Sequence, residues 1–495
     1  MKVLIFLPYG GISPHHFSIG LEIVQEHLNK GNLVTVLDCN AHLNACSFNP
    51  KKIRSLCINC VSIYNQGIKL LNGEPELLNY KYLKPEDKIF LKNLNLDIDS
   101  AEDLKKIKIE NYDIGMGVFA SIVSYHRTPN FNFQLNLPII KKLLYASCEV
   151  YFSIKNHLIA GNYEEVYLFN GRYSEFRAVF RAAQHFNTKA KLYEYGSDLS
   201  KYAVYDDYLP HSIINTTKLI EIAWQECRDT IYRKKKGEEF YINNVNGIEK
   251  AFYSFIKDQN HLLLPENFDA KKTNIVIYNT CEDELVAIDD EWTNNLYSNQ
   301  VKAIIKIIKS VEQFSEAKKY HIYLRLHPNL KTSPEDDSHK LIDFESEIFT
   351  FIPADSKISS YNILLKADII LTFGSTMGIE AAFFDKPSIL LGPSFYQNLG
   401  STYLPKNHEE VVALLQNRTL LPLNKEGAIK YGFYMSTFGI DKKISKMNDF
   451  IKLESLKGQT LKADPIAKFK LDVLFVLNNP LKYLKLKLSR LKKVG

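Results

Sequence analysis

Short apolar runs that end in glycine or polar residues recur along both halves of this chain. Lys2 to Pro8 reads KVLIFLP and is followed by Tyr9, two glycines and a segment with helical spacing from Phe17 to Asn29. Leu33 to Leu37 (LVTVL) is the next apolar run. Apolar runs of this length between turn residues are typical of buried strands, and a helix between two of them indicates a βαβ unit. The first half is therefore predicted to begin as a Rossmann-like domain, although it lacks the full G-x-G-x-x-G pattern of dinucleotide sites.

The same pattern returns in the middle of the first half. Glu165 to Phe169 is predicted to be a strand, Gly171 to Phe186 a helix, and Lys191 to Tyr193 another strand. Polar residues follow both strands: Asn170 and Arg172 come after the first, and Glu194 after the second. Ligands of open α/β sheets bind beyond the carboxyl ends of the strands, so these side chains are candidates for a cleft.

The stretch from Tyr202 to Phe268 has a helical pattern with a charged break at Arg233 to Glu239. We expect helices that close the first domain and a linker into the second. Asn274 to Tyr278 (NIVIY) is then predicted to be the first strand of the second domain, and it is followed by an acidic segment that ends at Glu284. Glu284 is a candidate for contact with acceptor or donor sugar.

Two segments of the second half carry candidate phosphate-binding residues. Tyr320 to Leu326 (YHIYLRL) is predicted to be a strand with Arg325 near its end, and His327, Pro328 and Asn329 follow it. Arg325 or His327 could contact phosphate oxygens at the carboxyl edge of a parallel sheet.

About forty residues later, the chain reads as strand, glycine turn, helix and strand. Asp368 to Phe373 is the predicted strand, Gly374 to Thr376 the turn, Met377 to Phe384 the helix, and Ile389 to Leu391 the next strand. A helix that begins at such a turn directs backbone N–H groups and its positive dipole end at the sheet edge, which suits a diphosphate. Glu380 could accept hydrogen bonds from ribose hydroxyls. Taken alone, this segment fits an ordinary βαβ crossover with a serine cap equally well.

The RLHPN motif, together with SSYNILLKADIILTFGSTMGIEAAFFDKP, resembles the C-terminal half of bacterial capsule and surface-polysaccharide glycosyltransferases. These are GT-B-like enzymes, distantly similar to capsule Kdo transferases and bacterial polysialyltransferases. The resemblance implies that His327 and Pro328 hold the donor phosphate. It implies the same role for Ser375 and Thr376, and a ribose contact for Glu380. Similar motifs occur in GT-B-like epimerases and in glycerophosphotransferases.

An inverting glycosyl transfer needs a base for the acceptor hydroxyl, and Glu194 is our candidate. The related polysialyltransferases have an acidic pair before glycine at the comparable place, whereas this chain has Glu194-Tyr195-Gly196. Glu194 fits a loop cap or an ion pair with a nearby arginine equally well. His15 and His16, in the loop after the first strand, are competing bases.

Four of the seven cysteines fall early, at Cys39, Cys46, Cys57 and Cys60. The Cys-x-x-Cys spacing permits a structural zinc site, and free buried thiols are the alternative. Disulfides are not expected, because Met1 to Pro8 does not have the form of a secretory signal. We predict no metal for catalysis, since no Asp-x-Asp follows a strand of the second half.

Length and charge complete the prediction. The chain has 495 residues, which is too long for one core, and its 45% hydrophobic and 24% charged residues are ordinary for a globular protein. From Lys468 the tail has eight basic residues against one acidic residue, whereas the whole chain has a net charge of +6. Leu481 and the leucines after it recur at helical spacing. An amphipathic basic tail on a near-neutral body indicates an anionic lipid surface rather than nucleic acid.

We therefore expect an α/β, GT-B-like protein with two Rossmann-like domains facing a cleft. The predicted units are an acceptor domain at 1–268, a donor domain at 269–460 and a basic tail at 461–495. The predicted activity is transfer of a sugar from a CMP- or UDP-linked donor to a surface polysaccharide or lipid-linked acceptor. The predicted location is the cytoplasmic side of the inner membrane. A GT-B-like epimerase or hydrolase, and a non-catalytic assembly or export partner, stay open as alternatives.

Overall fold

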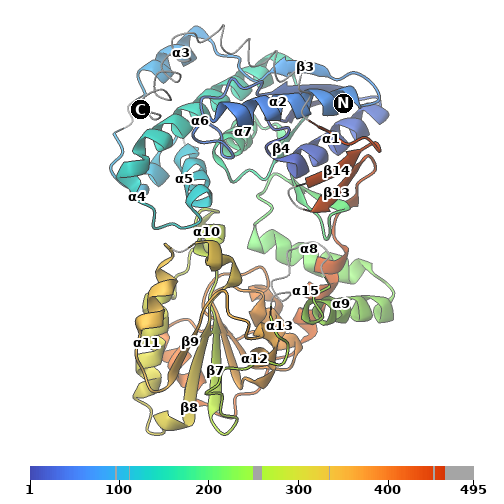
Figure 1. Cartoon of the computed structure of the whole chain (residues 1–495). Helices are drawn as coiled ribbons and strands as arrows, with labels where there is room; N and C mark the ends of the chain where they lie inside the picture. Colours follow the sequence, from blue (N-terminus) through green and yellow to red (C-terminus); the bar gives the residue numbers. More distant parts are fainter. Residues whose placement is uncertain (95–96, 111, 249–258, 334, 450–451, 463–495) are drawn as a thin grey trace, which may run out of the picture.

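Two α/β units, each built around its own sheet, make up the chain (Figure 1). The computed structural model describes residues 1–94, 97–110, 112–248, 259–333, 335–449 and 452–462. The first unit occupies the upper part of Figure 1 and the second unit the lower part.

The sheet of the first unit has the strand order β12-β6-β5-β4-β1-β2-β3. Strands β1 to β5 run parallel, β6 pairs antiparallel with β5, and β12 pairs antiparallel with β6. The strand bounds are β1 Lys2–Phe6, β2 Leu33–Asp38, β3 Glu76–Asn79, β4 Glu165–Phe169, β5 Lys189–Tyr195, β6 Lys201–Asp206 and β12 Ile440–Asp441. The chain winds outward from β1 to β3 and then returns to β4 on the other side of β1. A topological switch point therefore lies between β1 and β4.

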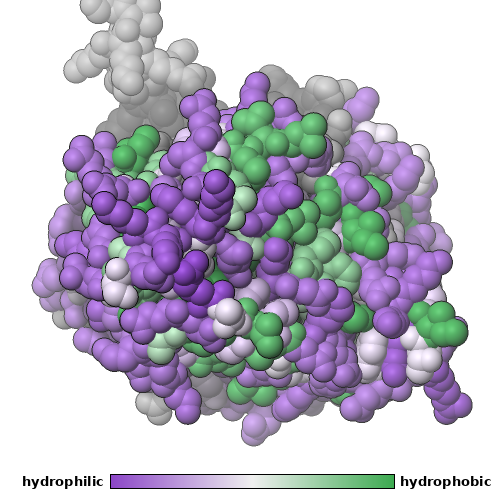
Figure 2. All heavy atoms as spheres, turned by 90° about the horizontal axis from the view of Figure 1, so that it is seen from below, coloured by the Kyte–Doolittle hydropathy of each residue, from purple (hydrophilic) through white to green (hydrophobic). Residues whose placement is uncertain are grey.

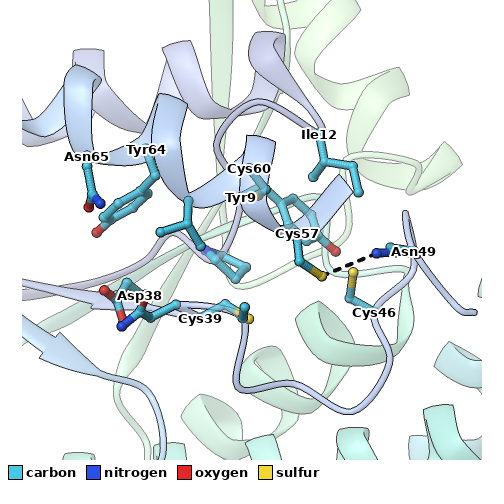
Figure 3. Close-up of a pocket in the computed structure, with 14 residues that line it drawn as sticks. Tyr9, Ile12, Asp38, Cys39, Cys46, Asn49, Cys57, Cys60, Tyr64 and Asn65 are labelled. Carbon is cyan, nitrogen blue, oxygen red and sulfur yellow. Dashed lines mark hydrogen bonds between the residues drawn. The ribbon is translucent and has the colours of Figure 1, made fainter. Parts of the chain in front are cut away.

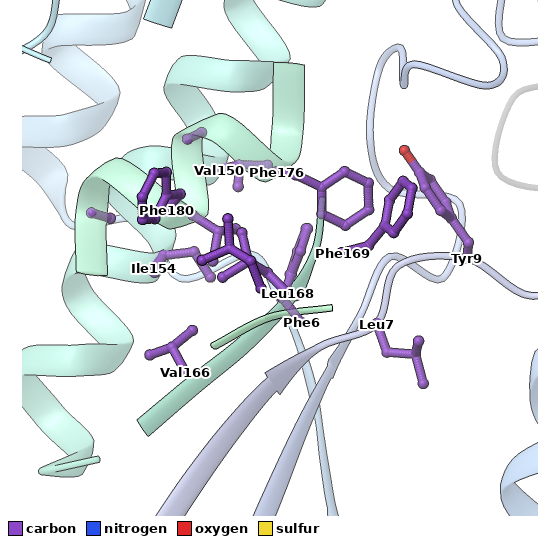
Figure 4. Packing of buried hydrophobic residues seen from close by; sticks show 14 of the residues in the cluster. Phe6, Leu7, Tyr9, Val150, Ile154, Val166, Leu168, Phe169, Phe176 and Phe180 are labelled. Carbon is purple, nitrogen blue, oxygen red and sulfur yellow. The ribbon is translucent and has the colours of Figure 1, made fainter. Parts of the chain in front are cut away.

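Helices cover both faces of this sheet. Their bounds are α1 Pro14–Asn29, α2 Arg54–Lys69, α3 Pro85–Lys92, α4 Ala101–Lys106, α5 Ile114–His126, α6 Phe133–Gly161 and α7 Ser174–His185. Figure 4 shows Phe6 and Leu168 of β1 and β4 packed beside Phe176 and Phe180 of α7. These side chains are buried because both faces of a parallel sheet are covered.

The second unit has a five-stranded parallel sheet with the order β11-β10-β7-β8-β9. Its strands are β7 Thr273–Tyr278, β8 Tyr320–Arg325, β9 Phe349–Ile352, β10 Ile369–Thr372 and β11 Ser388–Leu390. Its helices are α10 Glu282–Leu285, α11 Gln300–Glu312, α12 Ser360–Lys366, α13 Met377–Phe383 and α14 His408–Gln416, with short 3₁₀ turns that include Pro328–Thr332. The chain again winds outward from the central strand β7 and returns beside it, so this switch point lies between β7 and β10.

The last part of the described chain returns to the first unit. Helix α15 (Glu426–Thr437) packs against α8 (Ile213–Glu226) and α9 (Thr230–Val245). After it, β12 joins the first sheet, and the hairpin of β13 (Ser445–Asp449) and β14 (Lys452–Leu456) packs on α1. The first unit is therefore built from both ends of the described chain.

The two Rossmann-like sheets confirm the predicted α/β, GT-B-like fold class. The predicted unit boundary at 268/269 stays a proposal, and so does the one at 460/461. Most of the predicted basic tail, from residue 463 on, lies outside the described residues.

The prediction for residues 202 to 268 was wrong at two places. Its start is β6, an edge-side strand that pairs with β5 rather than a helix. The charged run from Arg233 to Glu239 is no break, because it lies inside α9. Lysine, arginine and glutamate are good helix formers, and here they extend a helix whose buried face carries Gly237 and Tyr241.

Seen from below, the surface is mostly hydrophilic, with apolar patches separated by polar residues (Figure 2). None of the helices in the described part of the chain is long and apolar enough to cross a membrane.

Candidate functional site

The carboxyl ends of the strands at the two switch points carry most of the predicted site residues. In the first unit these are the loops after β1 and β4. In the second unit they are the loops after β7 and β10, flanked by the loop after β8. Loops at a switch point diverge to opposite faces of the sheet and leave a crevice between them, which is where open α/β sheets bind ligands.

His327 lies at the edge of the second sheet directly after β8. Its backbone N–H donates to Oδ1 of Asn279 at 2.8 Å, and its Nδ1 accepts the backbone N–H of Asn329 at 3.2 Å. Burial, together with the charges of Arg325 and Arg127, lowers the pKa of His327 to about 4. The ring is therefore neutral at pH 7. Because Nδ1 accepts from Asn329, the ring proton is on Nε2, which can donate to an anionic oxygen.

The glycine turn after β10 is held in a conformation that a side chain would obstruct. Gly374 has φ +115°, and a Cβ there would lie 2.6 Å from the carbonyl oxygen of Pro393. Ser375 follows, and its Oγ accepts the backbone N–H of Met377 at 3.3 Å. Thr376 is exposed at the N-cap of α13. The turn therefore presents small hydroxyl side chains and backbone at the switch point.

Arg325 and Glu380, the other two predicted donor residues, lie in the interior of the unit. Arg325 is 1% exposed, and its guanidinium donates to the carbonyl oxygens of Leu326 and Ser356, each at 3.3 Å, and to Oγ of Ser360. These bonds hold the loop between β9 and α12. Glu380 is 3% exposed and accepts the hydroxyl of Tyr361, while burial raises its pKa to about 7. The phosphate and ribose contacts predicted for them stay predictions.

Glu194 and Asn170 meet at the edge of the first sheet. Asn170 Nδ2 donates to Oε2 of Glu194 at 2.5 Å, and the backbone N–H of Tyr195 donates to Oε1 at 3.1 Å. Asn170 and Gly171 both have positive φ, 55° and 77°, so a sharp turn directs the Asn170 amide at the carboxylate. Burial raises the pKa of Glu194 to about 7 against the two hydrogen bonds that lower it. A carboxylate that titrates near neutrality is suited to proton transfer.

His15 and His16 lie at the start of α1 and pack against aromatic residues of β4 and β5. The His15 ring meets Tyr195 edge-on with centroids 4.1 Å apart, and the His16 ring stacks on Phe169 at 3.6 Å. They are 1% and 8% exposed, and burial lowers their pKa values to about 2 and 3. Groups this reluctant to accept a proton are poor bases, so the pKa shifts favour Glu194 over the two histidines.

Arg172 connects the two switch points. It follows β4, is 5% exposed, and donates from Nη1 to the carbonyl oxygen of Glu284 at 2.8 Å and from Nη2 to that of Asp283 at 2.7 Å. Both carbonyls belong to α10, directly after β7. Asn329 Nδ2 reaches Oε1 of Glu284 from the other side at 3.3 Å. The structure thus brings Arg172 and Glu284 together and places the His327 edge next to the Asn170 edge.

Two basic residues of this region were missed by sequence reasoning. Arg127 caps α5, is 45% exposed at its side chain, and lies 3.9 Å from Oδ2 of Asp283. Lys442 arrives with the returning C-terminal segment, and its Nζ lies 3.1 Å from Nε2 of His15. Arg127 is not near a strand end, and Lys442 follows β12, a two-residue strand that the sequence did not predict. A positive residue at a helix end was the only available signal for Arg127.

Glu22 holds the returning segment in place. Its carboxylate accepts the backbone N–H groups of Lys443, Ile444 and Ser445 at 2.7 to 2.9 Å, and also the hydroxyl of Ser445. Glu22 is 5% exposed in the middle of α1. This carboxylate therefore fixes the position of Lys442 beside His15.

Cys39, Cys46, Cys57 and Cys60 line one pocket at the carboxyl ends of β1 and β2 (Figure 3). All seven cysteines are free. No group of three or more His, Cys, Asp or Glu side chains in the described ranges is arranged to hold a metal ion. The predicted structural zinc stays a proposal that would require the four thiols to rearrange.

No protein-family profile matches the chain. The search of curated proteins also finds no match. Among solved structures, the chain is similar to the KpsC β-Kdo 2,4 transferase of Thermosulfurimonas dismutans, with a TM-score of 0.36 and 14% identity over 55% of this chain and 88% of that one.

Two further solved structures cover most of the chain. The UDP-GlcNAc 2-epimerase of Methanocaldococcus jannaschii, in complex with UDP-GlcNAc and UDP, is similar with a TM-score of 0.25 and 11% identity over 97% of this chain and 99% of that one. MurG of Acinetobacter baumannii is similar with a TM-score of 0.25 and 13% identity over 87% of this chain and 94% of that one. At TM-scores this low, the fold assignment rests on the strand order and switch points of the structure itself.

Proposed function

We propose that this protein is a GT-B-type glycosyltransferase that moves a sugar from a nucleotide-sugar donor to a surface polysaccharide or a lipid-linked acceptor. The observation that carries the proposal is the contact of the two switch points through Arg172 and α10. This contact supports a site in which the second unit binds phosphate and the adjacent edge of the first unit supplies acid–base chemistry. The motif resemblance and the kinds of structural neighbours agree with it.

The second unit is proposed to hold the nucleotide. Nε2–H of the neutral His327 ring donates to a phosphate oxygen, and Ser375, Thr376 and the backbone of the glycine turn surround the phosphate. A hydrogen bond from this neutral ring can stabilise the negative charge that grows on the departing phosphate. CMP-linked and UDP-linked donors both fit this scheme.

The first unit is proposed to activate the acceptor. The acceptor oxygen attacks the anomeric carbon, the bond from that carbon to the donor phosphate breaks, and the hydroxyl proton moves to Glu194. The nucleotide leaves with the electron pair of the broken bond. Asn170 orients the carboxylate through its 2.5 Å hydrogen bond. This scheme is inverting and requires a base with a pKa near the working pH.

Three further parts of the proposal concern the metal requirement, the location of the protein and its basic tail. Catalysis is proposed to need no metal, because His327 and the glycine turn supply the charge stabilisation. The protein is proposed to work at the cytoplasmic face of the inner membrane. The basic tail, most of which lies outside the described residues, is proposed to bind anionic lipid there.

The test is a nucleotide-release assay on the purified full chain. Panels of CMP-linked and UDP-linked sugars are incubated with EDTA, with and without oligosaccharide acceptors, and free nucleotide and new glycan are measured. The proposal predicts acceptor-dependent release and an extended glycan in the presence of EDTA. Release without any acceptor would identify a hydrolase, and conversion of the nucleotide sugar to an isomer without release would identify an epimerase. No release and no nucleotide binding would favour a non-catalytic assembly partner.

A further inference from the structure

A pocket beside the acceptor edge is not used by the scheme above. We call it the thiol pocket, and it is lined by Cys39, Cys46, Cys57 and Cys60 together with Tyr9 and Tyr64 (Figure 3). It lies where β1 and β2 end, on the same sheet edge as Asn170. Its interior is narrow, about 30 Å³, so it can take a small group such as an acyl group while the sugar ring stays at its mouth.

The thiol pocket is built tightly between the loop after β1 and helix α2. A Cβ at Gly10 would lie 2.2 Å from the carbonyl oxygen of Cys60, and one at Gly11 would lie 2.7 Å from a side-chain carbon of Ile63. The backbone N–H of Gly10 lies 3.1 Å from Sγ of Cys60. Two successive glycines therefore allow the loop to sit directly on α2, which gives the pocket a rigid wall.

The opposite wall is a strained loop after β2. Asn40 and Ala41 have φ values of 39° and 59°, in the left-handed region that alanine rarely adopts. Nζ of Lys52 donates to the carbonyl oxygen of Ala41 at 2.6 Å and also to that of Leu43. Such strain persists only where the surroundings enforce it, and it is typical of ligand sites.

The thiols make one end of the pocket apolar and uncharged. Burial raises the pKa of Cys39 to about 12 and also raises those of Cys46 and Cys60, so these groups are neutral thiols. A neutral thiol behaves as a small hydrophobe, whereas zinc requires the thiolate. This end of the pocket therefore suits a compact apolar group rather than an ion.

The other end carries an unsatisfied hydrogen-bond donor. Tyr64 is 5% exposed, and its buried hydroxyl has no hydrogen-bond partner among the described residues. Figure 3 shows this hydroxyl directed toward the side of the pocket where Asp38 lies, and the charge of Asp38 acts on it. A buried hydroxyl without a partner costs about 1 to 3 kcal/mol, so a ligand acceptor there would be bound favourably.

We infer that the thiol pocket binds an N-acylated amino sugar of the acceptor, with the acyl methyl against the thiols and the amide between Tyr64 and Asp38. The amide carbonyl accepts the Tyr64 hydroxyl, and the amide N–H donates to the Asp38 carboxylate. This inference rests on the proposed function for the identity of the ligand as acceptor. It names the class of sugar that the acceptor carries next to the reacting residue.

The test titrates the full chain with the methyl glycosides of N-acetylglucosamine, N-acetylgalactosamine, glucosamine and glucose, followed by ligand-observed NMR. We expect one N-acetyl form to bind about ten times more tightly than its counterpart without the acyl group, since one good hydrogen bond corresponds to about that factor. In Tyr64→Phe the preference should disappear while the melting temperature stays the same or rises. The matched control Tyr323→Phe removes a hydroxyl that donates to Asn267 in the second unit and should leave the preference intact.

Thiol labelling gives a second readout that needs no variant. The bound N-acetyl glycoside should slow modification of the half-buried Cys57 and Cys60 by N-ethylmaleimide at least threefold and leave Cys227 unaffected. Equal binding of all four glycosides, or a preference that survives in Tyr64→Phe, would overturn the inference. Stabilisation by Zn²⁺ that is lost in Cys57→Ser would overturn it in favour of a metal site.

Nucleotide binding, measured in parallel, separates this inference from the proposed function. UDP or CMP binding without any glycoside preference refutes the inference and leaves the proposed function standing. A glycoside preference without nucleotide binding supports a sugar site in the first unit and refutes the proposed transfer.

Discussion

Replacement of Glu194 by glutamine should abolish transfer while stabilising the protein at alkaline pH. The carboxylate is largely buried beside Asn170, and this burial raises its pKa from the usual 4.5 to about 7. Each pKa unit corresponds to about 1.4 kcal/mol, so ionised Glu194 costs the folded state up to about 3 kcal/mol at pH 8. This figure is an upper limit, because the side chain keeps some contact with solvent.

The direction of this stability change follows from the linkage between proton binding and folding. Between pH 4.5 and 7 the folded protein holds a proton on Glu194 that the unfolded chain has lost, so wild-type stability falls as the pH rises through this window. Glutamine does not titrate. The variant should therefore match the wild type near pH 4.5 and exceed it above pH 7, while the transfer rate at pH 8 falls about 10²- to 10⁴-fold.

The assay is urea unfolding at pH 5 and pH 8, together with initial transfer rates across the same range. In the wild type, the rate should rise with pH through about 7. Glu110→Gln is a matched control with the opposite sign. Although burial raises the pKa of Glu110, hydrogen bonds from Lys155 and Tyr151 lower it, so its contribution is present at pH 8 and lost in acid. A Glu194→Gln protein that is less stable at pH 8, or that retains activity, would refute the role of this carboxylate as a buried base.

Three further substitutions test the parts that position the site. Arg172→Ala should lower the free energy of unfolding by about 2 to 3 kcal/mol, because it removes the two hydrogen bonds from the buried Arg172 guanidinium to α10. Scanning calorimetry should then show two transitions, where one is expected for the wild type. Arg172→Lys should not restore the single transition, because lysine lacks the planar fork of arginine. Gly374→Ala should abolish nucleotide binding, measured by titration calorimetry, and lower the free energy of unfolding by about 2 to 4 kcal/mol, measured in urea. The reason is that the new Cβ would lie 2.6 Å from the Pro393 carbonyl oxygen, at a residue whose φ is +115°. Glu22→Gln should release the 443–445 segment, seen as loss of hydrogen-exchange protection in the β13–β14 hairpin with little change in β7 or β8; unchanged protection would contradict the role of Glu22 as the anchor of that segment.

The strands and helices next to glycine turns were predictable because their signals are local. The strand Glu165–Phe169 was predicted with its observed bounds, and the helix after Gly374 ends one residue earlier than expected. In both places an apolar run of strand length stops at a glycine or asparagine with positive φ. Periodicity and turn residues are enough to identify such elements.

The elements that depend on distant partners were not predictable. β12 exists because Ile440 pairs with Tyr202 of an edge strand more than two hundred residues earlier. Lys442 reaches His15 only because Glu22 captures the backbone after it. Nothing local in Asp441-Lys442-Lys443 indicates either contact.

Burial also separated residues that looked equivalent in the sequence. Arg325 and His327 both come at the end of β8, and both were candidates for phosphate binding. Arg325 is the last residue of β8 and points into the unit, where it holds the loop before α12. His327 lies beyond the end of the strand, at the edge. The direction of a side chain at a strand end depends on register with its neighbours, which periodicity alone does not give.

The central claim is that the second unit binds a nucleotide at the His327 edge, and isothermal titration calorimetry of the full chain with CMP, CDP, UDP and GDP tests it most directly. The account predicts that one base is preferred and that binding is lost in His327→Ala. It should persist in His408→Ala, because His408 contacts Tyr297 and Ser310 at the start of α14, away from this edge. Absence of binding by all four nucleotides, or binding that is unchanged in His327→Ala, would contradict the account.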